Sequence, residues 1–238
     1  MSGPGRDPRV DLWTFSLTAG SARLQELESW LTPAERQRAD RYHFDSDRYR
    51  FVVSRGTLRQ IVGRRLETQP GRVPIATTPQ GKPVVVDAPF ELSLSHSAGL
   101  GLLAVGKVEH LGVDLEPWTR AQDMAALEAI ALSPGERHQL SELPDALRPA
   151  AALSAWVQKE ACLKGRGTGL LVDPRTVEVR VDLRQPGRLI RIDGCGREAD
   201  RWTVQRLAPR PGYTAAVAWR GPTVPILART FQPGGCSP

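Results

Sequence analysis

The segment Leu31-Thr-Pro-Ala-Glu-Arg36 returns later in the chain as Leu132-Ser-Pro-Gly-Glu-Arg137. In each copy a Thr or Ser precedes a Pro, which is typical of a helix N-cap followed by the first helical residue. A second pair of similar segments follows in the same order. Residues 51–59 resemble residues 156–164 in their aromatic residue, leucine and final cation. The sequence therefore predicts an internal duplication.

Strand-like runs with alternating apolar residues lie between and after the predicted helices. They cover residues 83–86, 90–97, 101–105, 111–116, 176–183, 189–192, 202–207 and 213–219. Helices followed by antiparallel-looking strands are typical of an α+β fold rather than a doubly wound parallel sheet. We expect a pseudo-dimer in which each half packs a small antiparallel sheet against a long helix. The predicted halves are residues 1–109 and 110–220, and the Pro- and Gly-rich residues 221–238 are expected to form a loosely ordered tail.

Composition narrows the range of partners and compartments. The formal charge of +6 favours polyanionic partners, but no basic run, RNP-like pattern or zinc-finger spacing supports a nucleic acid. The N-terminal residues lack the apolar segment of a signal peptide, and the longest apolar stretch, residues 100–105, is too short to span a bilayer. Three cysteines without a CxxC pair suit a reducing compartment. We expect a cytoplasmic monomer that binds neither nucleic acid nor membrane.

Two carboxylates share one face of a predicted strand. In Gly112-Val-Asp-Leu-Glu116, strand alternation directs Asp114 and Glu116 to the same side, with Cα atoms about 6.6 Å apart. Oxygen ligands at this spacing suit Mg²⁺, which takes one or two carboxylates and completes its shell with water and substrate phosphates. A half-buried strand with a solvated acidic face would give the same pattern.

A third carboxylate lies beside a cation on a predicted helix. Glu160 and Lys164 are four residues apart, so they share one helix face. A surface salt bridge would explain this spacing, and so would phosphoryl-type transfer, which needs a metal ligand or base and a positive charge at the leaving oxygen. The following Gly165-Arg-Gly-Thr-Gly169 either lets a phosphate approach the backbone or simply caps the helix.

Lysine is rare, because only four of the 32 basic residues are lysines. Three of the four lie in the motifs discussed here, which indicates that a compact ammonium is needed there. Ser95 and His96 invite comparison with a hydrolase, but no G-x-S-x-G elbow is present and adjacent strand residues point to opposite faces. A phosphate-binding edge and a structural histidine both remain possible readings of His96.

Five motifs occur in a recognisable order. They are Gly81-Lys-Pro83, Leu94-Ser-His-Ser97, Gly112-Val-Asp-Leu-Glu116, Trp156-x-x-Lys-Glu-Ala-x-x-Lys164 and Gly167-x-Gly-Leu170. Together they resemble the surfactin-synthetase-activating type of 4′-phosphopantetheinyl transferase over about residues 31–219. The resemblance implies a pseudo-dimer with coenzyme A in the cleft between the halves. It also implies transfer of the 4′-phosphopantetheine arm to a serine hydroxyl of an acyl or peptidyl carrier protein, with release of 3′,5′-ADP.

The resemblance also assigns roles to individual residues. It implies that Asp114, Glu116 and Glu160 hold Mg²⁺ against the pyrophosphate of coenzyme A. Glu160 or a nearby metal-bound water would take the serine proton, and Lys164 would neutralise charge on the phosphates or leaving group. The implied cofactor-binding residues are Arg50, Lys82, Ser95, His96, Asp114 and Lys164, with His96 and the cations chiefly around the 3′-phosphate.

One position departs from the family, and two other functions compete. Glu35 stands where some relatives carry a cation, so Arg38 is the expected contributor from the first helix. A nuclease with a D…(E/D)-x-K core would need a lysine two residues after Glu160, where Cys162 stands. A non-enzymatic binder of nucleic acid or acidic protein leaves the carboxylates unexplained.

The sequence does not select a fatty-acid, polyketide or nonribosomal-peptide carrier. Residues 118–130 are either the docking site of the carrier or a packed helix.

Overall fold

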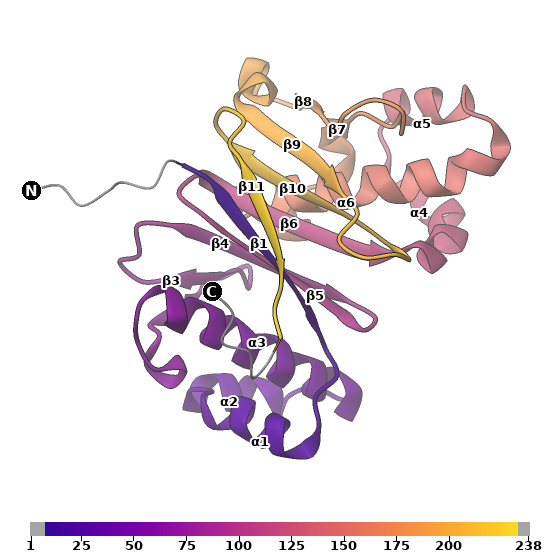
Figure 1. Cartoon of the computed structure of the whole chain (residues 1–238). Helices are drawn as coiled ribbons and strands as arrows, with labels where there is room; N and C mark the ends of the chain where they lie inside the picture. The colour runs from indigo at the N-terminus through magenta and orange to yellow at the C-terminus, as the bar shows by residue number, and fades with distance from the viewer. Residues whose placement is uncertain (1–7, 233–238) are drawn as a thin grey trace, which may run out of the picture.

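The computed structural model describes residues 8–232, apart from the side chains of residues 124–127 and 170. The chain forms two α+β halves whose sheets face each other, with helices on the outer side of each sheet (Figure 1). The predicted α+β pseudo-dimer is therefore confirmed. Among the described residues, no helix is long and apolar enough to cross a membrane.

The N-terminal half has a sheet in the order β11-β1-β5-β4. Strands β1 and β5, and β5 and β4, pair in antiparallel fashion, and a small hairpin of β2 and β3 lies beside them. Its elements are β1 (Val10–Ser16), α1 (Ser21–Ser29), α2 (Pro33–Ala39), α3 (Asp45–Arg65), η1 (Pro70–Arg72), β2 (Ile75–Thr77), β3 (Pro83–Val85), β4 (Glu91–Ser97) and β5 (Leu100–Gly106).

The C-terminal half repeats this arrangement with the sheet order β6-β10-β9 and the hairpin β7-β8. Its elements are β6 (Glu109–Pro117), η2 (Trp118–Asp123), α4 (Met124–Ala131), α5 (Pro134–Ser141), η3 (Asp145–Leu147), α6 (Arg148–Arg166), η4 (Gly169–Leu171), η5 (Pro174–Thr176), β7 (Val177–Val179), β8 (Leu189–Ile192), η6 (Gly196–Arg201), β9 (Trp202–Leu207) and β10 (Tyr213–Arg220). In each half the first strand pairs with the last, and the last pairs with the strand before it. The predicted duplication therefore appears in the topology.

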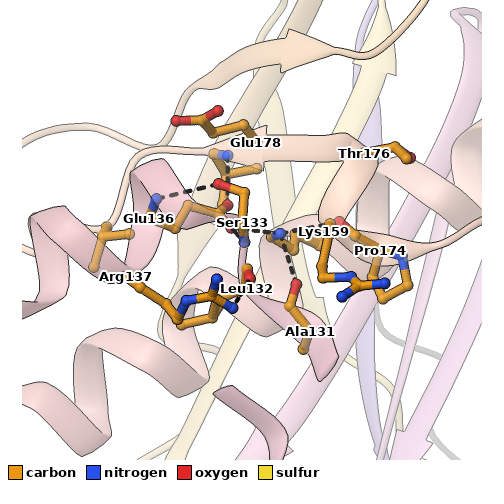
Figure 2. A network of polar contacts seen from close by, with 12 residues as sticks. Ala131, Leu132, Ser133, Glu136, Arg137, Lys159, Pro174, Thr176 and Glu178 are labelled. Carbon is orange, nitrogen blue, oxygen red and sulfur yellow. Dashed lines mark hydrogen bonds and ion pairs between the residues drawn. The ribbon is translucent and has the colours of Figure 1, made fainter. Parts of the chain in front are cut away.

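The two repeated helix starts are alike in atomic detail. Thr32 and Ser133 each form a capping box with the Glu three residues on. The same glutamates form buried ion pairs with the long helices, Glu35 with Arg59 at 2.8 Å and Glu136 with Lys159 at 2.5 Å. Figure 2 shows the second network, in which Lys159 also donates to the carbonyls of Ala131 and Pro174. In the structure, Arg59 of α3 therefore corresponds to Lys159 of α6. The sequence comparison matched Arg59 with Lys164 instead, and that match was wrong.

Three apolar clusters hold the layers together. One packs α3 against the N-terminal sheet, one packs α6 against the C-terminal sheet, and the third fills the space between the sheets. Strand β10 contributes side chains to two of these clusters. Val217 and Trp219 pack in the cluster between the sheets. Ala216 and Ala218 pack in the cluster with α6. The sheet that carries the C-terminal motifs is thus buried on both faces.

The end of the chain corrects one expectation. Residues 226–230, predicted to lie in a loosely ordered tail, form β11 (Ile226–Thr230), which pairs in parallel with β1. Val10 donates its N–H to the Pro225 carbonyl, and Phe231 donates to Thr14 and is buried in the N-terminal core. The Pro and Gly content gave no sign of this strand, because its partner lies at the other end of the chain. Residues 233–238 are outside the described part.

Candidate functional site

Strand β6 carries two of the predicted carboxylates on the face turned toward α6. Leu111, Val113 and Leu115 pack between the sheets, so alternation directs Asp114 and Glu116 to the opposite face. Asp114 is buried, with 5% of the residue exposed. The sequence prediction that both carboxylates share one side is confirmed.

Two glycines bring β6 and α6 unusually close. A Cβ at Gly112 would lie 1.9 Å from the Ala161 carbonyl oxygen, and one at Gly165 would lie 2.3 Å from the His110 carbonyl oxygen. Only glycine fits either position, because a side chain on one element would overlap the backbone of the other. Both glycines belong to the sequence motifs, but nothing in the motifs predicted this packing role. The close contact sets α6 directly beside Asp114.

Lys164 reaches from α6 to both neighbouring strands. Its Nζ donates to Asp114 Oδ1 at 2.6 Å and to Ser95 Oγ at 3.0 Å, and Ser95 Oγ donates to the same Asp114 oxygen at 2.8 Å. The Lys164 side chain is 30% exposed, whereas the Asp114 side chain is 7% exposed, so solvent reaches this ion pair from the Lys164 side. Three predicted residues from three elements are brought together.

Glu160 lies one helical turn before Lys164 and is close to the same carboxylates. The pKa of Glu160 is raised to about 7, first because burial desolvates the carboxylate and then because Asp114 repels its charge; Lys164 opposes this, and Glu116 adds to it. Within residues 8–232, Glu160 Oε1 and Asp114 Oδ2 are buried and have no hydrogen-bond partner. Unpaired buried carboxylate oxygens are costly and commonly mark a place where a ligand binds.

Both oxygens of Glu116 have partners. Ser97 Oγ donates to Oε2 at 2.5 Å, and Arg120 donates to Oε1 at 3.0 Å. Burial raises the pKa of Glu116, the Ser97 hydrogen bond opposes this rise, and Asp114 adds to it. Neither Ser97 nor Arg120 was predicted for this role from the sequence, although Arg120 follows Glu116 by four residues.

The donor set suits a hard cation. Among the described side chains, no three His, Cys, Asp or Glu are placed to hold a metal as they stand. Lys164 neutralises one oxygen of Asp114, and Ser97 and Arg120 hold those of Glu116. The unpartnered oxygens of Asp114 and Glu160 nevertheless fit Mg²⁺, which prefers carboxylate oxygen.

His96 and Arg50 lie together on the other face of β4. Leu92 and Leu94 of β4 pack toward α3, and alternation places His96 on the same side, near Arg50 of α3. The pKa of His96 is lowered, first because surrounding protein desolvates the ring and then because Lys164 and Arg50 repel its proton. Ser95, next to His96, instead faces Asp114. Ser95 and His96 thus point to opposite faces of β4, as predicted. Lys164 and Arg50 place positive charge near His96, which favours an anion, although Arg50 also pairs with Asp47 at 3.1 Å.

Two of the scarce lysines have structural partners. Lys159 is fully buried against Glu136. Lys82 pairs with Glu91 at the start of β4, whereas His96 lies near its end. The predicted contributor Arg38 stacks over Phe51, with 5.3 Å between the guanidinium carbon and the ring centroid. Of the lysines in the motifs, Lys164 is the one whose ammonium contacts the carboxylates of the site.

Comparison with known proteins places this geometry in a family. Residues 110–218 match the family described as "4'-phosphopantetheinyl transferase superfamily". Residues 18–107 match the family described as "4'-phosphopantetheinyl transferase, N-terminal". The chain belongs to the 4′-phosphopantetheinyl transferase superfamily. The boundary between the two matches falls at the start of β6, where the second half begins.

Individual relatives agree with this membership. The chain is 33% identical over 216 residues to the 4′-phosphopantetheinyl transferase HetI of Nostoc sp., covering 89% of this chain and 88% of the relative. It is 31% identical over 147 residues to a putative 4′-phosphopantetheinyl transferase of Synechocystis sp., covering 60% and 59%. A phosphopantetheinyl transferase of Thraustochytrium sp. is 24% identical over 202 residues, covering 78% and 70%. This family uses coenzyme A and acts on carrier proteins.

Proposed function

We propose that this phosphopantetheinyl transferase is of the surfactin-synthetase-activating type. In this proposal it moves the 4′-phosphopantetheine arm of coenzyme A to a serine of an acyl or peptidyl carrier protein and releases 3′,5′-ADP. The observation that carries the proposal is the convergence of Asp114, Glu116 and Glu160 with Lys164 where β6 and α6 meet. Three carboxylates beside one ammonium suit a metal and a pyrophosphate better than a neutral substrate.

We propose that the phosphates of coenzyme A bind across the end of β4. His96 and Arg50 would contact the 3′-phosphate on the α3 side, and Ser95 and Lys164 would contact the pyrophosphate on the β6 side. Asp114, Glu116 and Glu160 would hold Mg²⁺. When bound, Mg²⁺ neutralises pyrophosphate charge and stabilises the charge that develops during transfer. The electrostatic setting of His96 and the unpartnered oxygens described above support these assignments.

The transfer itself needs a base and a cation. The serine oxygen of the carrier attacks the phosphorus next to pantetheine, the new P–O bond forms, and the bond to the departing 3′,5′-ADP oxygen breaks. Glu160 would accept the serine proton, because burial beside Asp114 raises the proton affinity of its carboxylate in the metal-free protein. Lys164 supplies positive charge to the leaving phosphate.

We also propose that the protein works as a cytoplasmic monomer. Cys162 and Cys195 are free thiols, as expected in a reducing compartment. The pseudo-dimer contributes Ser95 from one half and Asp114, Glu160 and Lys164 from the other, so one chain supplies every side chain of the site.

Intact-mass analysis tests the proposed function. Candidate apo carriers are incubated with enzyme, coenzyme A and Mg²⁺, and the expected result is a carrier heavier by one phosphopantetheine. Asp114→Ala should abolish the adduct, and so should EDTA. Asp145→Ala serves as the matched control, because the Asp145 side chain is 89% exposed and lies outside the five motifs. An adduct that forms at the normal rate with Asp114→Ala or in EDTA would contradict the metal assignment.

A further inference from the structure

Strands β4 and β6 meet along a seam that has no backbone ladder. Among the described strands, β6 pairs with β10 and β4 pairs with β5. Alternate side chains of β4 bridge the gap: Ser93 Oγ accepts from the Val113 N–H at 3.0 Å, and Ser95 donates to Asp114. Side chains therefore set how the N-terminal half sits against the strand that carries the carboxylates.

Lys82 lies at the end of this seam farthest from Ser97. Its Nζ donates to Glu91 Oε2 at 3.1 Å, to the Leu111 carbonyl at 3.0 Å and to the Gly165 carbonyl at 3.5 Å. Glu91 Oε2 also accepts from the Leu111 N–H at 3.3 Å. One ammonium has three protons, and here three protein acceptors surround it. The contacts join the turn before β3, the start of β4, the edge of β6 and the end of α6.

The backbone holds Lys82 in this position. Lys82 follows Gly81, whose φ of 90° is accessible mainly to glycine, and the turn is closed by hydrogen bonds between Thr78 and Lys82. The side chain is 13% exposed. From Glu91 to His96 the strand rises about 17 Å, so the ammonium points to the other end of β4 from the proposed 3′-phosphate site.

We propose that Lys82 and Glu91 form a clasp that holds the start of β4 against β6 and the end of α6, so that Lys82 supports transfer as a positioning residue. The inference rests on the proposed function for its effect on catalysis. Gly165 directly follows Lys164, and Leu111 lies about 10 Å before Asp114 along β6. Loosening the clasp therefore shifts the two groups that must meet at the pyrophosphate, and small displacements of reacting groups are costly in rate.

Kinetics with two donors separates this role from direct binding of coenzyme A. Lys82→Met should lower kcat by roughly ten- to a hundredfold with both coenzyme A and dephospho-coenzyme A, and KM for either donor should change little. Glu91→Gln, which removes charge from the clasp, should also lower kcat. The double variant should be no slower than Lys82→Met alone. Lys107→Met is the matched control, because Lys107 is exposed in the turn between β5 and β6, and it should behave like the wild type.

Unfolding without substrate provides the second readout. The destabilisation by Lys82→Met and Glu91→Gln should be less than additive in the double variant, as expected for two contacting residues. This cycle still tests the clasp if the wild type proves to have no transferase activity. The proposal is overturned if Lys82→Met raises KM for coenzyme A alone, if kcat stays normal in the folded variants, or if the two effects on stability are additive.

Discussion

Glu160 should make the stability of the metal-free protein fall as pH rises. Burial beside Asp114 raises the pKa of Glu160 from 4.5 to about 7, so the folded protein holds a proton that the unfolded chain has lost. This contribution to stability is fully present below about pH 4.5 and disappears as pH passes about 7. A pKa difference of about 2.5 corresponds to about 3 kcal/mol.

The assay compares wild type with Glu160→Gln, which keeps the shape of the side chain and cannot ionise. Urea unfolding in EDTA at pH 5 and pH 8 should show that the wild type loses about 2 to 3 kcal/mol more than the variant over this interval. For a chain of this size the matching Tm difference is roughly 5 to 10 °C. Glu142→Gln is the matched control, since Glu142 is 67% exposed.

The pH dependence of unfolding must be compared between wild type and Glu160→Gln, because burial also raises the pKa values of Glu116 and Glu136. Those carboxylates change the pH dependence of the free energy of unfolding in wild type and variant alike. The difference between the two pH profiles therefore reports the contribution of Glu160. At pH 8 the variant should be the more stable protein, because it no longer buries a charge beside Asp114. Parallel profiles, or a wild type that is more stable than Glu160→Gln at pH 8, would refute the desolvation argument.

Three further substitutions test separate parts of the structure. His96→Ala should lower kcat/KM for coenzyme A by about 10- to 150-fold and have little effect with dephospho-coenzyme A; equal losses with both donors would remove His96 from the 3′-phosphate. Gly112→Ala should lower stability by about 3 kcal/mol or prevent folding, because its Cβ meets a backbone carbonyl, whereas Gly99→Ala has nothing within 4 Å and should unfold like wild type in a thermal scan. Lys159→Met should cost about 3 to 5 kcal/mol in urea unfolding, because it leaves Glu136 buried and unpaired. Arg184→Met, at an exposed pair, should cost less than about 1 kcal/mol, and equal costs would contradict the burial argument.

Local signals predicted much of the fold. The helix starts at Pro33 and Pro134 follow from Thr32 and Ser133, because a cap involves residues within one turn of each other. Strand alternation likewise placed Asp114 and Glu116 on one face. Strands β1, β2 and β11 were not predicted, and the pairing of β1 with β11 joins opposite ends of the chain, which no local pattern indicates. In the 176–183 run, only Val177–Val179 forms a strand.

The sequence predicted which residues form the candidate site, but it predicted few of the contacts between them. The resemblance brought Ser95, Asp114 and Lys164 to one cleft, but it gave no reason for the three to share hydrogen bonds. Those contacts depend on how closely β6 approaches α6, which Gly112 and Gly165 control. In the sequence, close backbone packing is visible only as a glycine, and the glycine does not indicate which segment packs against it. That segment is identified only from the fold.

The duplication explains why the carboxylates gather in one half. The ion pairs of Glu35 with Arg59 and Glu136 with Lys159 fix the alignment of α3 with α6. Counting on from this pair places Gln60 opposite Glu160, and Arg64 opposite Lys164. A neutral amide is a poorer Mg²⁺ ligand than a carboxylate and cannot act as a base at neutral pH. The N-terminal helix thus keeps the packing of its counterpart without its chemistry, and Arg50 on this helix is the cation proposed above for the 3′-phosphate of coenzyme A.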